Sequence, residues 1–276
     1  MAADSVEPGQ HYDRVTAAWR LIFGPQLHYG VFDPGDSLDS ATDRLTALML
    51  ETAAIGSAGA EVLDVGSGTG AIACRLATGA GARVLGITTS SVGVEMGRAT
   101  AAELGVDRVS FELRDGTDNG LPDASYDVVW VLESSHLMRQ RERLVAECAR
   151  VLRRGGRICL CDIMLRRDLS FAEVKAARKD LALLRDVFGD AHMEQLDRYA
   201  GWLADHGVTV DTAVDLTDRT RPTFAAWRAN IDAHRSRIVE LMGEPSTEAF
   251  VAATYVLERL WDEGIMGYGL IGGTRR

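Results

Sequence analysis

The sequence predicts an α/β fold in which helices cover both faces of a doubly wound parallel sheet. From about residue 60, short apolar runs alternate with amphipathic segments, as parallel strands joined by helices do. A glycine-rich turn follows the first of these runs directly, which is a common passage from strand to helix in such sheets. The 276 residues, 46% of them hydrophobic, suffice for one sheet-centred core with additions.

The core of the chain is expected to contain five strands and three helices. The strand ranges, all short and apolar, are 61–65, 83–88, 109–113, 127–132 and 157–163. A first helix opens at Ile72, a second covers 92–104 and a third covers 141–152. Gly155-Gly156 is expected to stop the third helix, because glycine favours helix C-termini.

Beyond residue 165 the alternation stops, which predicts an insertion. One long amphipathic helix is expected there, with an apolar face formed by Phe171, Val174, Leu181, Leu184 and Phe188. The first 48 residues also have a helical pattern and lie outside the alternating core.

The rest of the chain is expected to return to the core. A turn at His206-Gly207 leads into a strand over 208–216. The helix from Pro222 carries one stripe formed by Phe224, Trp227, Ile231, His234, Ile238 and Leu241. Another helix runs over about 247–261, and 267–272 is expected to be a closing edge strand.

Charge and cysteine usage exclude several classes of protein. A net charge of −10 disfavours a nucleic-acid binder, which needs a basic face. No apolar run approaches the ~20 residues of a membrane helix, and residues 1–10 carry no basic region, so no signal peptide is expected. The four cysteines (Cys74, Cys148, Cys159 and Cys161) lack C-x-x-C spacing and a histidine at ligand spacing, so no metal site is expected. We expect a cytoplasmic protein with no nucleic-acid or membrane partner.

The strongest signal is the segment Asp64-Val65-Gly66-Ser67-Gly68-Thr69-Gly70, between a strand and a helix. Glycines at such a turn let the backbone approach a ligand and adopt positive φ. The helix behind the turn offers free N–H groups to an anionic group. A relaxed dinucleotide-binding fingerprint also fits these glycines. That reading fails because Thr88-Thr89 stands where a ribose-binding acid is required, and because Asp64 is placed to reach an ammonium group, which NAD lacks.

The run EVLDVGSGTG resembles the first motif of class I S-adenosylmethionine-dependent methyltransferases. That resemblance implies a seven-stranded Rossmann-like sheet whose last strand is antiparallel. Asp115-Gly116 matches the position at which the family receives the adenine amino group. The stretches 121–122, 125–127 and 150–157 match the family's segments before its fourth and fifth strands.

A small-molecule branch of this family is the most similar. Thr88 replaces the usual ribose-binding acid, as in sarcosine and tocopherol methyltransferases, cyclopropane synthases and rebeccamycin-type sugar O-methyltransferases, although Gly93 stands where those enzymes often have Gln. Tyr12-Asp13 and 27–30 resemble the branch's N-terminal segment, which folds over the cofactor. For Tyr12 and Tyr29, plain helix packing is the alternative.

The resemblance implies S-adenosyl-L-methionine as cofactor and S-adenosyl-L-homocysteine as product. The residues expected to bind the cofactor are Tyr12, Tyr29, Asp64, Gly66, Gly68, Thr88, Thr89, Asp115, Gly116 and Glu133. An acid that favours a helix dipole is the alternative role for Glu133. The expected division of the chain is an N-terminal helical cap (1–48), a cofactor-binding core (49–165), a helical lid insertion after the fifth strand (166–205) and a C-terminal part of the core with substrate-side helices (206–276).

His136 and Asp162 are the catalytic candidates. His136 follows the fourth strand, where side chains face the pocket of such sheets, and a neutral imidazole can act as general base. Asp162 ends the neighbouring fifth strand and could orient the imidazole. Rebeccamycin-type enzymes, by resemblance, carry catalytic His and Asp in this spacing. The alternatives are a pocket-shaping role for His136 and a turn-capping role for Asp162. His234 is expected to be a core residue, with a substrate role as the alternative. Cys159 and Cys161 are also expected to be core residues.

The function that we expect is methyl transfer to a small molecule, to a hydroxyl of a specialised natural-product metabolite, with His136 as base. Transfer to nitrogen or carbon is an alternative, since a neutral amine needs no base. A cyclase or regulator that binds the cofactor without methylation is another. A homo-oligomer that shares its N-terminal arm is compatible with the sequence, which leaves the acceptor open.

Overall fold

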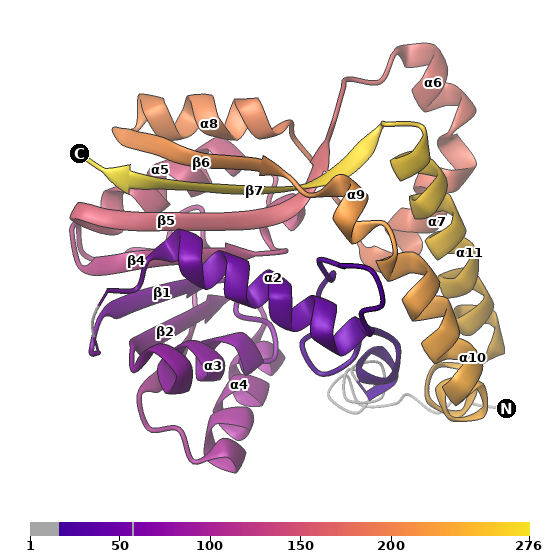
Figure 1. Ribbon diagram of the computed structural model, residues 1–276, viewed down its shortest axis with the longest axis horizontal. Coiled ribbons are helices and arrows are strands. Elements are labelled where there is room, and N and C mark those ends of the chain that lie inside the picture. Colours follow the sequence, from indigo (N-terminus) through magenta and orange to yellow (C-terminus); the bar gives the residue numbers. More distant parts are fainter. Residues whose placement is uncertain (1–16, 57) are drawn as a thin grey trace, which may run out of the picture.

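A computed structural model describes residues 17–56 and 58–276. Its centre is a seven-stranded sheet in the order β3-β2-β1-β4-β5-β7-β6 (Figure 1). The strands are β1 (Glu61–Val65), β2 (Arg83–Thr88), β3 (Val109–Leu113), β4 (Tyr126–Leu132), β5 (Leu152–Leu165), β6 (Val208–Asp215) and β7 (Met266–Arg275). Strands β1 to β5 pair in parallel, and β7 is antiparallel to both β5 and β6. The predicted seven-stranded sheet with an antiparallel last strand is confirmed.

Helices cover both faces of the sheet and its right-hand end in Figure 1. The helices are α2 (Leu38–Ala53), α3 (Ala71–Ala80), α4 (Ser91–Leu104), α5 (Arg141–Val151), α6 (Phe171–Ala176), α7 (Arg178–Phe188), α8 (Leu196–Asp205), α9 (Thr217–Thr220), α10 (Thr223–Met242) and α11 (Glu244–Asp262), with a 3-10 turn η1 at Ser135–Leu137. Residues 17–23 are also helical. None of the described helices is long and apolar enough to cross a membrane.

Alternation along the strands divides the core into two layers. Val62, Trp130 and Cys159 face the layer that α2, α3 and α4 cover, whereas Leu63 and Val129 face α5 and α8. Cys159 and Cys161 are fully buried in the first layer, as predicted for core residues. Because β1 lies between β2 and β4, the chain winds in both directions from it, and the carboxyl ends of these strands form a switch point where ligands bind in such folds.

Two predictions about strands were wrong. The closing strand is not at the edge: β7 lies between β5 and β6, so β6 is the edge strand. Gly155-Gly156 also does not lie beyond a helix end, because the helix stops at Val151 and β5 already starts at Leu152. The glycines lie inside β5, where its pairing with β4 shifts register and Gly155 has φ of 80°, so they form an irregularity in the strand.

Two helix predictions were also wrong. The long helix of the insertion is divided at Ala177 into α6 and α7. Phe171 is 85% exposed and no residue of α6 is buried, whereas Leu184 of α7 is buried against the body of the protein. His234 is exposed, and α10 kinks at that residue (φ −116°, ψ 16°), which turns it away from the buried stripe that includes Ile231.

Candidate active site

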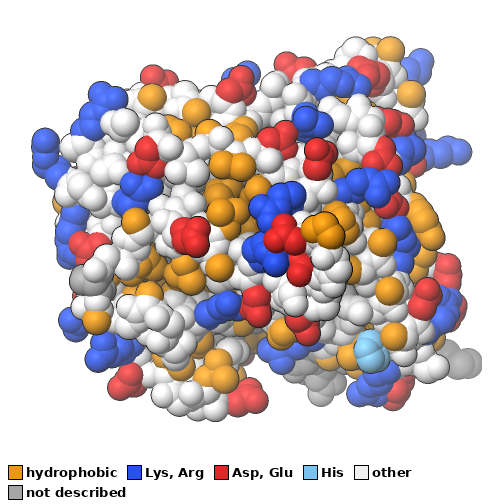
Figure 2. Space-filling model, in the orientation of Figure 1, with side chains coloured by type: hydrophobic (Ala, Val, Ile, Leu, Met, Phe, Trp, Pro, Cys, Tyr) orange, Lys and Arg blue, Asp and Glu red, His pale blue; other side chains and the backbone are white. Residues whose placement is uncertain are grey.

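One cleft of about 1440 Å³ lies at the carboxyl ends of the central strands. Its lining includes the glycine turn after β1, the ends of β2 and β4, the N-terminal segment 26–29 and the helix α7. Chain segments far apart in sequence therefore meet here. Basic and acidic side chains are interspersed on the face drawn in Figure 2, without a continuous basic band there.

The three glycines of the turn have different structural roles. Gly66, Gly68 and Gly70 all have positive φ (84°, 53° and 78°). A side chain at Gly66 would overlap Ser134, and one at Gly70 would lie 2.6 Å from the Phe111 ring. A Cβ at Gly68 would meet nothing within 4 Å. Gly66 and Gly70 therefore allow close packing of the protein, whereas Gly68 exposes its backbone to the cleft.

Beside this turn, the Asp64 carboxylate has an oxygen that accepts no hydrogen bond from the described residues. The side chain is buried, and its Oδ2 has no hydrogen-bond partner among the described residues. Burial raises the pKa of Asp64 to about 7, because no neighbour stabilises the ionised form. A buried, unpaired carboxylate is costly, so the arrangement suits a cationic ligand group in the cleft.

The other predicted cofactor residues line the same cleft, where the structure also gives them local partners. Thr88 Oγ1 accepts the Ser90 N–H at 3.2 Å. Asp115 Oδ1 accepts the N–H and the hydroxyl of Thr117, both at 2.8 Å. Thr89 and Gly116 complete the rim. Tyr12 lies outside the described residues.

Glu133, which follows β4, is hydrogen-bonded to two distant parts of the chain. It follows β4 with φ of 47°, and its Oε1 accepts the Tyr29 N–H at 2.8 Å and the Tyr268 hydroxyl. The Tyr29 ring packs among aromatic side chains, 5.8 Å from Trp261 and nearly parallel to it. Burial raises the pKa of Glu133 to about 7, although both hydrogen bonds favour ionisation. The residue precedes a 3-10 turn and is not in the first turn of a helix, so the helix-dipole interpretation does not apply.

His136 and Asp162 form a buried pair. His136 Nδ1 lies 2.6 Å from Asp162 Oδ1, and the His136 N–H donates to Asp162 Oδ2 at 3.1 Å. The Asp162 side chain is 0% exposed and that of His136 is 12% exposed at the cleft wall. Burial lowers the pKa of His136, but the charge and hydrogen bond of Asp162 outweigh burial, so the net shift is upward. Asp162 Oδ1 also accepts the Ile163 N–H at 2.7 Å. Both residues lie inside β5, so the turn-capping alternative for Asp162 does not apply.

Comparisons with known proteins agree with this geometry. A family model described as a methyltransferase domain matches residues 63–160. The chain is 35% identical over 237 residues to the 27-O-demethylrifamycin SV methyltransferase of Amycolatopsis mediterranei, and the aligned residues cover 85% of each chain. It is 34% identical over 237 residues to methyltransferase GfsG of Streptomyces halstedii, covering 81% of this chain and 80% of that one. The solved structure of the cyclase SpnF matches with a TM-score of 0.78 at 27% identity, over 97% of this chain and 94% of that one.

The chain belongs to the S-adenosylmethionine-dependent methyltransferases. Within them, its relatives place it in the small-molecule O-methyltransferase family. The cofactor of this methyltransferase is S-adenosylmethionine. The cleft suits that cofactor, because its lining includes the unpartnered Asp64 oxygen, which can accept from an ammonium group, and Gly68, beside which there is open space.

The opposite wall of the methyltransferase cleft is mostly apolar, although Arg178 and Arg185 of α7 also line the cleft. The side chains that line it are Phe23, Leu27, Leu181, Leu184, Phe188, Trp227, Leu257 and Met266. They come from the N-terminal segment, α7, α10, α11 and β7. An apolar wall excludes water from the reaction and favours an acceptor with a large apolar body.

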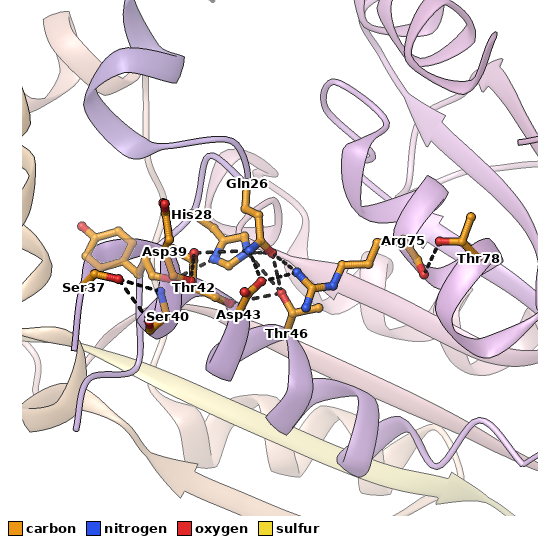
Figure 3. Close-up of polar contacts among 11 residues, drawn as sticks. Gln26, His28, Ser37, Asp39, Ser40, Thr42, Asp43, Thr46, Arg75 and Thr78 are labelled. Atoms are coloured by element: carbon orange, nitrogen blue, oxygen red, sulfur yellow. Dashed lines mark hydrogen bonds and ion pairs between the residues drawn. The ribbon is translucent and has the colours of Figure 1, made fainter. Parts of the chain in front are cut away.

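The structure adds a polar network that sequence reasoning missed. Arg75 on α3 donates to Gln26 Oε1 at 3.0 Å and to Asp43 on α2, while the buried His28 lies 3.2 Å from Gln26 (Figure 3). Burial lowers the pKa of His28 to about 4, so the ring is neutral near pH 7. The network ties the N-terminal segment to the helix behind the glycine turn. Hydrogen-bonded residues from different segments of this network are 16 or more positions apart in the sequence. No sequence spacing therefore predicts the network.

Proposed function

We propose that this methyltransferase transfers the methyl group of S-adenosylmethionine to a hydroxyl group of a natural-product metabolite, with His136 as general base. The observation that carries the proposal is the 2.6 Å contact between His136 Nδ1 and the buried Asp162 carboxylate at the cleft wall. With Nδ1 committed to Asp162, the basic lone pair of the imidazole is on Nε2. The relative of A. mediterranei, whose name specifies an O-demethylated rifamycin, supports a natural-product acceptor.

The cofactor supplies an electrophilic methyl group on a sulfonium. We assign its binding to Asp64, whose free oxygen accepts from the ammonium group, and to the backbone at Gly66 and Gly68. The remaining contacts that we assign to the cofactor come from Tyr29, Thr88, Thr89, Asp115, Gly116 and Glu133, which line the cleft, and from Tyr12.

The chain's part in the reaction is positioning and proton removal. The apolar wall holds the acceptor and keeps water out, which makes orientation the largest contribution. His136 Nε2 removes the hydroxyl proton as the new bond forms. Asp162 holds the ring and stabilises the imidazolium that results.

Acceptor recognition is assigned to the cap (1–48) and the lid (166–205), and cofactor binding to the core (49–165); residues 206–276 add substrate-side helices. Supporting this division, Leu27 and Leu181 lie on the apolar wall, whereas the glycine turn belongs to the core. The cytoplasmic location and the homo-oligomer stay predictions.

The test has two steps. Calorimetric titration of cofactor-stripped protein with S-adenosylmethionine and S-adenosylhomocysteine is expected to show micromolar binding of both. A screen of hydroxylated natural products with labelled methyl donor then identifies the acceptor, and His136→Gln is expected to reduce turnover by about 100-fold or more with unchanged cofactor affinity. His234→Gln, an exposed histidine, is the matched control. Full turnover of H136Q would show that His136 is not the base and would favour nitrogen or carbon acceptors.

A second candidate is a cyclase that keeps the cofactor. The 27% identity to SpnF over 97% of this chain favours it over a regulator. In that case cofactor binding survives, whereas no acceptor in the screen gains label.

A further inference from the structure

Two buried hydroxyl groups extend the hydrogen bonds of the His136–Asp162 pair. Ser135 Oγ lies 2.6 Å from Asp162 Oδ2, and the Tyr199 hydroxyl lies 2.8 Å from Ser135 Oγ. Ser135 is 0% exposed and Tyr199 is 1% exposed. The three side chains come from η1, β5 and α8, so the chain of hydrogen bonds joins the catalytic pair to the segment that we assign to the lid.

The direction of these hydrogen bonds follows from the number of protons. An ionised carboxylate accepts only, so the single Ser135 hydroxyl proton points to Asp162. Ser135 Oγ can then only accept from Tyr199, whose hydroxyl is the donor. Each bond polarises the next in a site that water does not reach, which strengthens the donation to Asp162.

Four donors converge on the Asp162 carboxylate. Three of them are the His136 ring, the His136 N–H and the Ile163 N–H. Ser135 is the fourth, and among residues 17–56 and 58–276 it is the one side-chain donor besides the base itself. A buried carboxylate stays ionised only when donors offset the loss of water, so the hydroxyls help to keep Asp162 ionised and also moderate the charge that faces His136.

We propose that Ser135 and Tyr199 are positioning residues that hold Asp162 ionised and thereby set the basicity of His136. This inference rests on the proposed role of His136 as base. It gives both hydroxyls a function in the reaction without contact with the acceptor.

Other charged groups face this chain and are not altered by the test. Glu133 lies near His136 and is bonded to Tyr29 and Tyr268. Near Tyr199, Arg141 of α5 pairs with Glu194 at 2.9 Å. The His192 N–H also donates to the His136 carbonyl at 2.6 Å, so the segment before α8 holds the backbone of the base.

The test is the titration of the His136 imidazole by NMR in protein saturated with S-adenosylhomocysteine. Tyr199→Phe and Ser135→Ala are each expected to raise the pKa of His136, by about half a unit to one unit, because loss of one hydrogen bond leaves more of the Asp162 charge to stabilise the imidazolium. Tyr126→Phe removes a hydroxyl that has no hydrogen bond to any of the described residues and is the control. An unchanged His136 titration in both Y199F and S135A, with folding verified by thermal unfolding, would overturn the proposal.

A turnover measurement separates this inference from the proposed function. Y199F is expected to slow turnover about 3- to 10-fold at neutral pH, but to add nothing in the His136→Gln background, where no base remains. A further loss in the double variant would mean a purely structural role for Tyr199 and would contradict the inference. Full turnover of H136Q itself would instead contradict the base role, while the titration still reports on the hydroxyls.

Discussion

The cofactor side and the acceptor side of the cleft are built in opposite ways. On the cofactor side, β1, the glycine turn and α3 follow one another without interruption over residues 61–80. On the acceptor side, the apolar wall combines the N-terminal segment with α7, α10, α11 and β7, which are distant in sequence. The difference means that a local sequence motif can reveal the centre of the cofactor side, whereas the acceptor side exists only once the chain has folded.

The largest expected effect is the loss of cofactor affinity when the cofactor side is altered. Asp64→Asn is expected to weaken S-adenosylhomocysteine binding by about 100-fold or more, because it removes the charge that meets the ligand ammonium. The same variant is expected to raise the thermal stability of the free protein, because Asp64 is a buried carboxylate with an unpaired oxygen. Calorimetry and thermal unfolding measure the two effects. Asp118→Asn, an exposed acid of the same cleft, is the control, and equal losses in both variants would contradict the assignment.

The next effect separates packing from binding within the turn. Gly66→Ala is expected to destabilise the protein by about 2–4 kcal/mol, since its methyl group overlaps Ser134. Gly68→Ala meets open space and is expected to cost about 1 kcal/mol of backbone strain, but to weaken cofactor binding. Denaturant unfolding and calorimetry distinguish the two, and reversed effects would refute these roles.

A third effect is the pH dependence of turnover. In the proposed mechanism, His136 is a base only when it is neutral, and its pKa is raised above the ordinary value. Turnover is therefore expected to fall about tenfold per pH unit on the acid side of a midpoint above the ordinary histidine value. Asp162→Asn removes the charge that raises this pKa, so its midpoint is expected at lower pH. A midpoint that does not move would show that another group limits the rate.

The smallest effect tests the acceptor side alone. Leu181→Ala is expected to raise KM for the acceptor about 3- to 10-fold, because it removes apolar contact area from the wall. The affinity for S-adenosylhomocysteine is expected to stay the same. Phe171→Ala, at an 85% exposed position outside the cleft lining, is the control. A weaker cofactor affinity in L181A would mean that the two sides are not independent.

The same contrast explains how far sequence reasoning reaches. The strands 61–65, 83–88 and 109–113 have the predicted bounds, because strand length and turn residues are local signals. The pairing of His136 with Asp162 was also anticipated, since the ends of neighbouring parallel strands meet at one edge. Ser135 and Tyr199 were missed because no spacing links residues 64 positions apart. His234 was misplaced because a kink interrupts the helical period on which the prediction depended.

The place of β7 has a consequence for how the chain folds during synthesis. Residues 266–275 are the last strand to be made, yet they lie between β5 and β6. The edge strand β6 is synthesised more than 50 residues earlier, and its one neighbour among the described strands is β7. During synthesis β6 therefore has no strand to pair with until β7 has left the ribosome. The core (49–165), whose strands β1 to β5 pair with one another, is complete earlier and is able to form first. A ribosome-bound chain that stops before residue 266 is therefore expected to hold a formed glycine turn and an unformed acceptor wall.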